Sequence, residues 1–79
     1  MITRQISRGG KMIDYSPLWV TMREKGISQY YLLKNGIDSK TLDRLRNNCN
    51  ITMLTLEKLC TLLNCTPNDI VIFSSDSRF

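Results

Sequence analysis

The segment from Ile27 to Asn48 constrains the fold of this chain more than any other part of the sequence. Ser28 precedes a short apolar-rich stretch, and the pair Asn35-Gly36 follows it. Serine is favoured just before the first residue of a helix, and glycine just after the last. A second short stretch, with leucines three residues apart, comes directly after the glycine. The segment is therefore predicted to form two short helices joined by a tight turn.

The second of these helices, predicted over residues 39–47, has one apolar and one polar face. Leu42 and Leu45 share a face and are expected to reach the core, and Asp38 or Ser39 is the expected N-cap. Two short helices around a tight turn, the second with an exposed polar face, form the layout of a helix-turn-helix. That motif places its second helix in the major groove of DNA.

The first of the two helices is expected to point Leu32 and Leu33 into the core, helped by either Tyr30 or Tyr31. Ile37 is expected to fill the turn. These side chains would hold the two helices together.

Further helices are predicted on both sides of this segment. Ser16 is the expected N-cap of a helix with Pro17 at its first position, and Gly26 is expected to end it. Thr52 is expected to cap a helix over residues 53–64. Its apolar residues at helical spacing are Leu56, Leu59, Cys60 and Leu63.

The last part of the chain combines a helical turn with a strand. Thr66-Pro67 is expected to open a short turn, and residues 70–73 have strand character that could pair with residues 12–15. The expected fold is all-α with five helices and an optional two-stranded sheet. The expected organisation is one helix-turn-helix domain over residues 12–74, with a flexible N-terminal arm over 1–11 and a flexible tail over 75–79.

Composition agrees with one small domain in a reducing compartment. The chain has 79 residues, of which 42% are apolar, and its net charge is +4, which fits a polyanionic partner. An odd number of cysteines without a secretory signal argues against a disulfide scaffold, and no apolar run reaches the ~20 residues that span a bilayer. We therefore expect a cytoplasmic protein that does not enter membranes.

Catalysis is not expected from this sequence. Histidine, the commonest general base, is absent, and no glycine-rich phosphate loop or metal-ligand spacing occurs. Cys60 and Cys65 lack the further ligands that a zinc site requires, so both are expected to be packed structurally, whereas Cys49 lies in a polar loop. No enzyme activity, metal, cofactor or small-molecule substrate is expected.

Several strings in this order resemble a known family. They are YSPLW, the turn residues Gly36-Ile37, TLDRLRNN, ITMLTLEKLC and LNCTPNDI, and they extend from about Met12 to Phe73. Together they are similar to the small XRE-type (Cro/cI-like) transcriptional regulators, which have a lambda-repressor-like fold. The resemblance implies binding of double-stranded DNA.

The resemblance also implies roles by position. Gln29, which opens the first helix of the motif, is expected to contact a phosphate, and the loop after the second helix is expected to lie along the DNA backbone. The residues expected to read bases are Ser39, Lys40, Thr41, Asp43 and Arg44. The residues expected to contact phosphates are Ser28, Gln29, Tyr30, Arg46, Asn48 and Asn50.

The chemistry of these side chains suits such roles. Lys40 and Arg44 are four residues apart and share a helix face, and Lys or Arg bound to guanine is the commonest specific contact. Thr41 can offer a methyl group to thymine. Asp43 could accept from a cytosine amine or hold a neighbouring arginine, and Arg46 is expected to meet a phosphate or a carboxylate.

The chain departs from the family pattern in two places. Gln29 and Gly36 are seven positions apart, one fewer than usual, and Leu32-Leu33 stand where the family prefers alanine. Both departures are expected to alter the packing of the two helices and therefore the base-reading positions.

Two functions remain open from the sequence. The first is a sequence-specific DNA-binding transcriptional regulator, expected to be a repressor and a homodimer, because operators commonly place two half-sites about one helical turn apart. The alternative is a protein-interaction module on the same scaffold, such as an antitoxin-like partner or a mobile-element accessory factor. The shortened turn keeps this alternative open.

Overall fold

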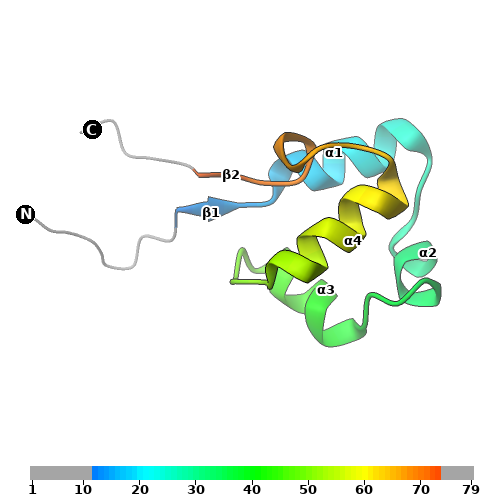
Figure 1. Cartoon of the computed structure of the whole chain (residues 1–79), viewed down its shortest axis with the longest axis horizontal. Helices are drawn as coiled ribbons and strands as arrows, with labels where there is room; N and C mark the ends of the chain where they lie inside the picture. Colours follow the sequence, from blue (N-terminus) through cyan, green and yellow to red (C-terminus); the bar gives the residue numbers. More distant parts are fainter. Residues whose placement is uncertain (1–11, 74–79) are drawn as a thin grey trace, which may run out of the picture.

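The structure, a computed structural model, describes residues 12–73 (Figure 1). Within that range the chain forms four α-helices, one 3-10 turn and a small antiparallel sheet. The elements are β1 (Ile13–Asp14), α1 (Ser16–Lys25), α2 (Gln29–Lys34), α3 (Ser39–Arg46), α4 (Met53–Leu63), η2 (Pro67–Asp69) and β2 (Ile72–Phe73). The predicted arm over 1–11 and tail over 75–79 lie outside the described residues.

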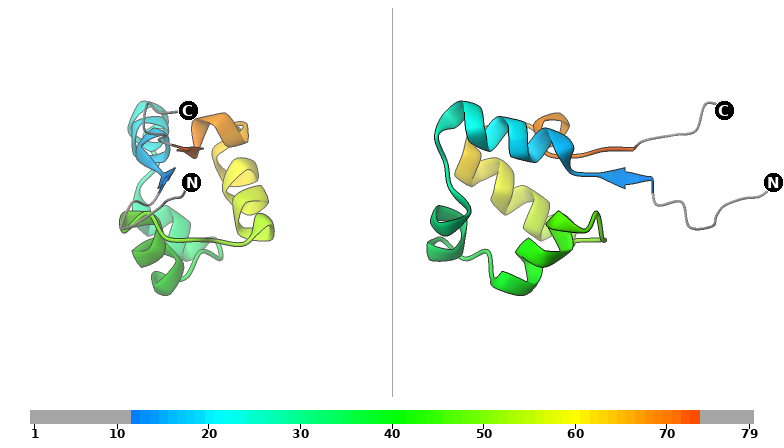
Figure 2. Two further views of the ribbon diagram at one scale, coloured as in Figure 1. Left: turned by 90° about the vertical axis from the view of Figure 1, so that its left-hand side faces the viewer. Right: turned by 180° about the vertical axis from the view of Figure 1, so that it is seen from behind.

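The core lies where the four helices meet. α1 packs against α4 and η2, and the α2–α3 pair completes the other side (Figures 1 and 2). α1, α3 and α4 contribute buried residues at helical spacing, and α2 contributes Leu32 alone. The buried hydrophobic residues are Tyr15, Leu18, Met22, Leu32, Ile37, Leu42, Leu45, Leu59, Leu63 and Ile70.

The start of α1 differs from the prediction that Ser16 is its N-cap. Ser16 is already the first helical residue, and Tyr15 occupies the cap position without a side-chain cap bond. The carboxylate of Asp14 accepts hydrogen bonds from the backbone N–H of Ser16 at 2.8 Å and from its hydroxyl at 2.6 Å. A carboxylate is a stronger acceptor than a hydroxyl, so Asp14 takes over this role. The hydroxyl bond of Ser16, followed by its backbone bond, lowers the pKa of Asp14.

Side-chain caps fix the starts of the other three α-helices. Ser28, Asp38 and Thr52 are the N-caps, which confirms the predicted caps of α2 and α4 and selects Asp38 over Ser39 for α3. Each cap oxygen accepts a backbone N–H three residues later: Tyr31 at 3.1 Å, Thr41 at 2.9 Å and Thr55 at 3.0 Å. Such bonds satisfy N–H groups that have no partner within the helix.

Two glycines with positive φ end α1 and shape the turn between α2 and α3. Gly26 has φ +67° and closes α1 as predicted, and Gly36 has φ +102°. The N–H of Ile37 donates to the carbonyl of Leu32 at 3.0 Å, and Ile37 is buried as expected. Lys58 on α4 donates to the carbonyl of Gly36 at 3.4 Å. The turn is therefore closed by its own backbone and held from α4.

Leu33 and the tyrosines of α2 are exposed, contrary to the prediction that they help to form the core. The exposed fraction is 43% for Leu33, 66% for Tyr30 and 43% for Tyr31, whereas Leu32 is fully buried. The helix has only six residues, so a single position faces inward and its neighbours, rotated by about 100° each, do not. Ile37, from the turn, fills the space instead.

The C-terminal part confirms the strand pairing and corrects the helix count. β1 and β2 are antiparallel with Ile13 opposite Phe73 and Asp14 opposite Ile72. The strand is shorter than predicted because Ile70 is buried in the core. The expected fifth helix is a 3-10 turn, η2, so the described residues contain four α-helices. The carbonyl of Asp69 in η2 accepts from the hydroxyl of the buried Thr21 on α1 at 2.8 Å.

Cys60 and Cys65 lie beside this core. Both are half-buried and have free thiols, and burial raises the pKa of each. This position agrees with the expected structural packing of both side chains.

Among the described residues, none of the helices has the length and apolar character needed to cross a membrane.

Leu59→Ala should strongly destabilise the fold. Leu59 is fully buried, so its removal loses transfer free energy and leaves a cavity, and we expect the free energy of unfolding to fall by ~2–5 kcal/mol. Leu54→Ala is the matched control on the same helix, because Leu54 is 75% exposed, and should change this value by less than ~0.5 kcal/mol. Urea denaturation followed by circular dichroism measures both. Equal losses for the two variants would contradict this packing.

The Asp38 cap should make stability depend on pH. The backbone bond from Thr41, followed by its side-chain bond, lowers the pKa of Asp38 below the ordinary value of 3.8 for an aspartate. The stabilisation is therefore complete above that value and is lost as the pH falls through the lowered pKa. Asp38→Asn keeps an acceptor at the cap but does not titrate. Thermal denaturation between about pH 5 and pH 2 should show a shallower loss of stability for this variant than for the native chain; identical slopes would refute the assignment.

Candidate nucleic-acid interface

α3 presents a polar face opposite the two leucines that hold it to the core. Leu42 and Leu45 are buried, and the intervening positions of this eight-residue helix point outward or along its flank. α2 and α3 form the lower part of the molecule in both views of Figure 2. Of the predicted base-reading residues, four are exposed and one is half-buried: Ser39, Lys40, Asp43 and Arg44 are exposed, and Thr41 is half-buried.

Charge is distributed unevenly along α3. The last turn carries Arg44 and Arg46, where positive side chains complement the negative end of the helix dipole. The first turn begins at the carboxylate of Asp38, which accepts the N–H of Thr41. This N–H is therefore engaged within the chain, and a negative charge lies beside Ser39.

Arg46 connects α3 to the first residue of α2. Its guanidinium donates to the side-chain oxygen of Gln29 at 2.7 Å. A second nitrogen of the same guanidinium lies 3.8 Å from the carboxylate of Asp43, one turn earlier on α3. Three residues with predicted DNA roles thus form one contiguous cluster across the two helices.

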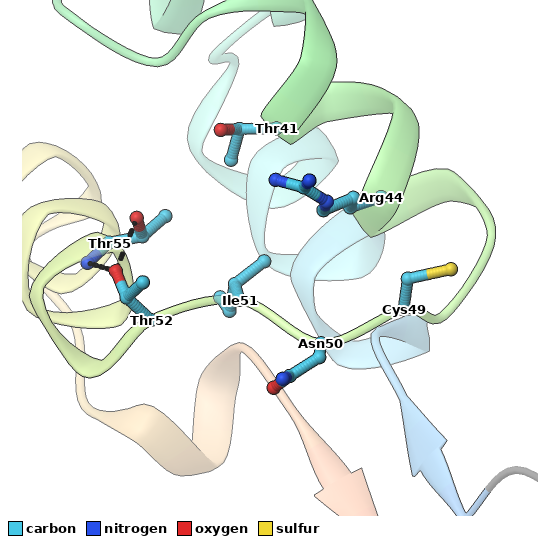
Figure 3. A pocket seen from close by; sticks show the side chains of 7 residues that line it. All are labelled: Thr41, Arg44, Cys49, Asn50, Ile51, Thr52 and Thr55. Carbon is cyan, nitrogen blue, oxygen red and sulfur yellow. Dashed lines mark hydrogen bonds between the residues drawn. The ribbon is translucent and has the colours of Figure 1, made fainter.

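A hollow of about 430 Å³ lies between α3 and the segment that leads into α4. Its lining residues are Thr41, Arg44, Cys49, Asn50, Ile51, Thr52 and Thr55. In Figure 3 the guanidinium of Arg44 extends from α3 above Ile51, toward the side on which Thr41 and Thr55 lie. Thr52 and Thr55 are joined by a hydroxyl–hydroxyl bond of 2.9 Å. The hollow therefore combines one guanidinium with several hydroxyl and amide groups.

Tyr15 anchors the loop after α3, a role that the sequence did not reveal. Its hydroxyl donates to the carbonyl of Cys49 at 2.7 Å, and its N–H donates to the side-chain oxygen of Asn48 at 3.0 Å. Burial raises the pKa of Tyr15. Asn48 has φ +56°, a conformation that asparagine adopts more readily than most residues. The Asn-rich composition was the only local sign of this tight loop.

The structure brings most of the predicted site residues to one side of the molecule. Gln29, Arg46 and Asp43 are in contact, and Arg44 and Asn50 line the same hollow. Other predicted phosphate ligands have partners within the chain. Ser28 caps α2, the side-chain oxygen of Asn48 accepts from Tyr15, and the ring of Tyr30 lies 5.5 Å from the ammonium of Lys34. The DNA roles of these residues stay predictions.

No group of three or more potential metal ligands occurs between residues 12 and 73. The arrangement described above instead offers an exposed helix with hydrogen-bond donors and acceptors, flanked by basic side chains. Major-groove readers are built in this way.

Comparison with known proteins agrees with this geometry. The family model of the Cro/C1-type HTH DNA-binding domain matches residues 17–76. The fold is similar to the crystal structure of the transcriptional regulator VanUg, with a TM-score of 0.77 and 23% sequence identity over 91% of this chain and 97% of that one. No curated protein was found to match the sequence. Because the family match covers well over half of the sequence, the chain belongs to the family of Cro/C1-type helix-turn-helix DNA-binding domains.

Proposed function

We propose that this protein is a sequence-specific transcriptional regulator that binds double-stranded DNA and reads the major groove with α3. It acts in the cytoplasm as a homodimer and represses by occupying its operator. The similarity of its fold to that of the transcriptional regulator VanUg supports this proposal. The observation that carries it is the exposed face of α3, which bears Lys40 and Arg44 one turn apart.

This face supports direct reading of bases. Lys40 and Arg44 can donate to the O6 and N7 atoms of guanine, and each good contact discriminates by roughly 1–3 kcal/mol. Ser39, Thr41 and Asp43 complete the proposed reading set. They add a hydroxyl group, a methyl group and a carboxylate, and these groups can distinguish between base edges.

Contacts to the DNA backbone are proposed on both sides of α3. Gln29, the first residue of α2, and Arg46, the last residue of α3, are in contact through their side chains, and Asn50 lines the same hollow as Arg44. Ser28, Tyr30 and Asn48 complete the proposed phosphate set. Such contacts fix the position of a protein on the duplex and carry no sequence information directly.

The small size of the proposed reading element supports dimerisation. One helix of eight residues reaches only a few base pairs, and a two-fold operator with half-sites about 34 Å apart requires a second copy. Repression follows because an occupied groove excludes other proteins.

The shortened turn does not favour the alternative role of a protein-interaction module. Although Gln29 and Gly36 are only seven positions apart, the turn still buries Ile37, and the N–H of Ile37 donates to the carbonyl of Leu32. The exposed face of α3 is retained.

Selection of bound sequences from a random duplex pool should enrich a palindromic motif. Lys40→Ala and Arg44→Ala should each reduce the preference for this motif over random DNA by ~10-fold or more, because base contacts are lost. Gln29→Ala should weaken binding to all sequences alike. Fluorescence anisotropy across a salt series measures these affinities, and log K should fall by ~0.9 per phosphate neutralised as log salt rises.

Lys25→Ala is the charge-matched control, because Lys25 is the last residue of α1, close to Cys65. It should leave the sequence preference unchanged. Failure to enrich any motif would refute sequence-specific binding and favour the protein-interaction alternative. Equal effects of Lys25→Ala and Lys40→Ala would refute the role of α3.

A further inference from the structure

We propose that Arg46 is a positioning residue that orients the side chain of Gln29 for phosphate binding. The proposal rests on the proposed DNA-binding function and deepens it. It adds to the phosphate contact proposed for Arg46 an indirect role that is exerted through another residue.

The contact between Arg46 and Gln29 determines which end of the glutamine amide faces the guanidinium. A guanidinium group has donors only, whereas a glutamine amide has an oxygen acceptor at one end and an NH2 donor at the other. The bond of 2.7 Å from Arg46 must therefore go to the oxygen of Gln29. This bond directs the NH2 group of Gln29 away from Arg46.

A phosphate group requires a hydrogen-bond donor from Gln29. Phosphate oxygens are acceptors, so only the NH2 end of Gln29 can bind them. Without Arg46 the amide could rotate, and the oxygen end would face the phosphate in part of the population. Arg46 thus holds the Gln29 amide with its NH2 donor toward the phosphate before DNA binds, which lowers the conformational entropy lost on binding.

Arg46 is itself held by Asp43. It is the last residue of α3, and Asp43 lies 3.8 Å from its second nitrogen. Arg46 is 49% exposed and Asp43 is 71% exposed, so their ion pair contributes little to folding stability. The ion pair instead orients the guanidinium of Arg46, because it holds this group between α3 and Gln29. The cluster also ties the position of α2 to that of the reading helix.

A double-mutant cycle tests the proposal. Gln29→Ala, Arg46→Met and the double variant are measured by anisotropy on the enriched duplex at one salt concentration. Gln29→Ala should weaken binding by ~10-fold in the native chain but by less than ~2-fold in the Arg46→Met background, because the amide is no longer aimed. The general attraction between the Arg46 charge and DNA cancels, because the effect of Gln29→Ala is measured within each background separately. Equal losses in both backgrounds would overturn the proposal.

Arg46→Lys is the conservative variant. It keeps the charge and can donate to the oxygen of Gln29, so the effect of Gln29→Ala should be largely restored in its background. Lys25→Met removes a positive charge elsewhere and should leave the full effect of Gln29→Ala in place. If Arg46→Lys behaves like Arg46→Met, Arg46 does not act by donating to Gln29.

A measurement on the free protein separates this proposal from DNA binding as such. The NMR order parameter of the Gln29 side-chain NH2 group should be high in the native chain and fall below ~0.6 in Arg46→Met. Unchanged order would refute the positioning role even if the protein binds DNA. If the native chain binds no DNA while this order does fall, the contact is real, and the proposed function fails together with the phosphate role.

Discussion

Burial of Leu42 and Leu45 sets the orientation of α3 on the core. These two leucines fix which face of α3 meets the core, and they thereby fix which face meets a partner. They belong to one core cluster with buried residues from every other α-helix, so α3 is part of the core as well as of the surface. A helix of eight residues has little stability of its own, and tertiary packing therefore supplies it.

The segments before and after α3 fix its position on the core. Before α3, the closed turn at Gly36 is held by Lys58 from α4, and the Asp38 side chain caps the first helical turn. After α3, Tyr15 holds the loop at Cys49 through its hydroxyl. Both ends of α3 are thus tied to distant parts of the chain. Precise placement of donors and acceptors is what base recognition requires.

Local signals in the sequence predicted the elements that depend on local interactions. Ser28 and Thr52 were identified as caps because the bonds that they make reach only three residues, and Gly26 was identified because its conformation excludes most other residues. Leu33 was misjudged because apolar character does not reveal how few positions of a six-residue helix face inward. The family resemblance supplied the fold, and the matching family model confirms it.

Contacts between distant residues could not be predicted in this way. Tyr15 meets Cys49 across 34 positions, and Arg46 meets Gln29 across 17. Neither pair shares an element or a spacing pattern, so only the assembled core brings them together. The individual site residues were proposed from their chemistry and from the family pattern. The structure adds which of them support one another.

The most direct test of the central claim is to map the DNA-binding face by NMR. Amide chemical shifts of the protein are recorded with and without the enriched duplex. If α3 reads DNA, the largest changes should occur over Ser39–Arg46 and at Gln29, with small changes in η2 and at the end of α1. Large changes confined to β2 and η2, with α3 unaffected, would contradict the claim that α3 reads DNA.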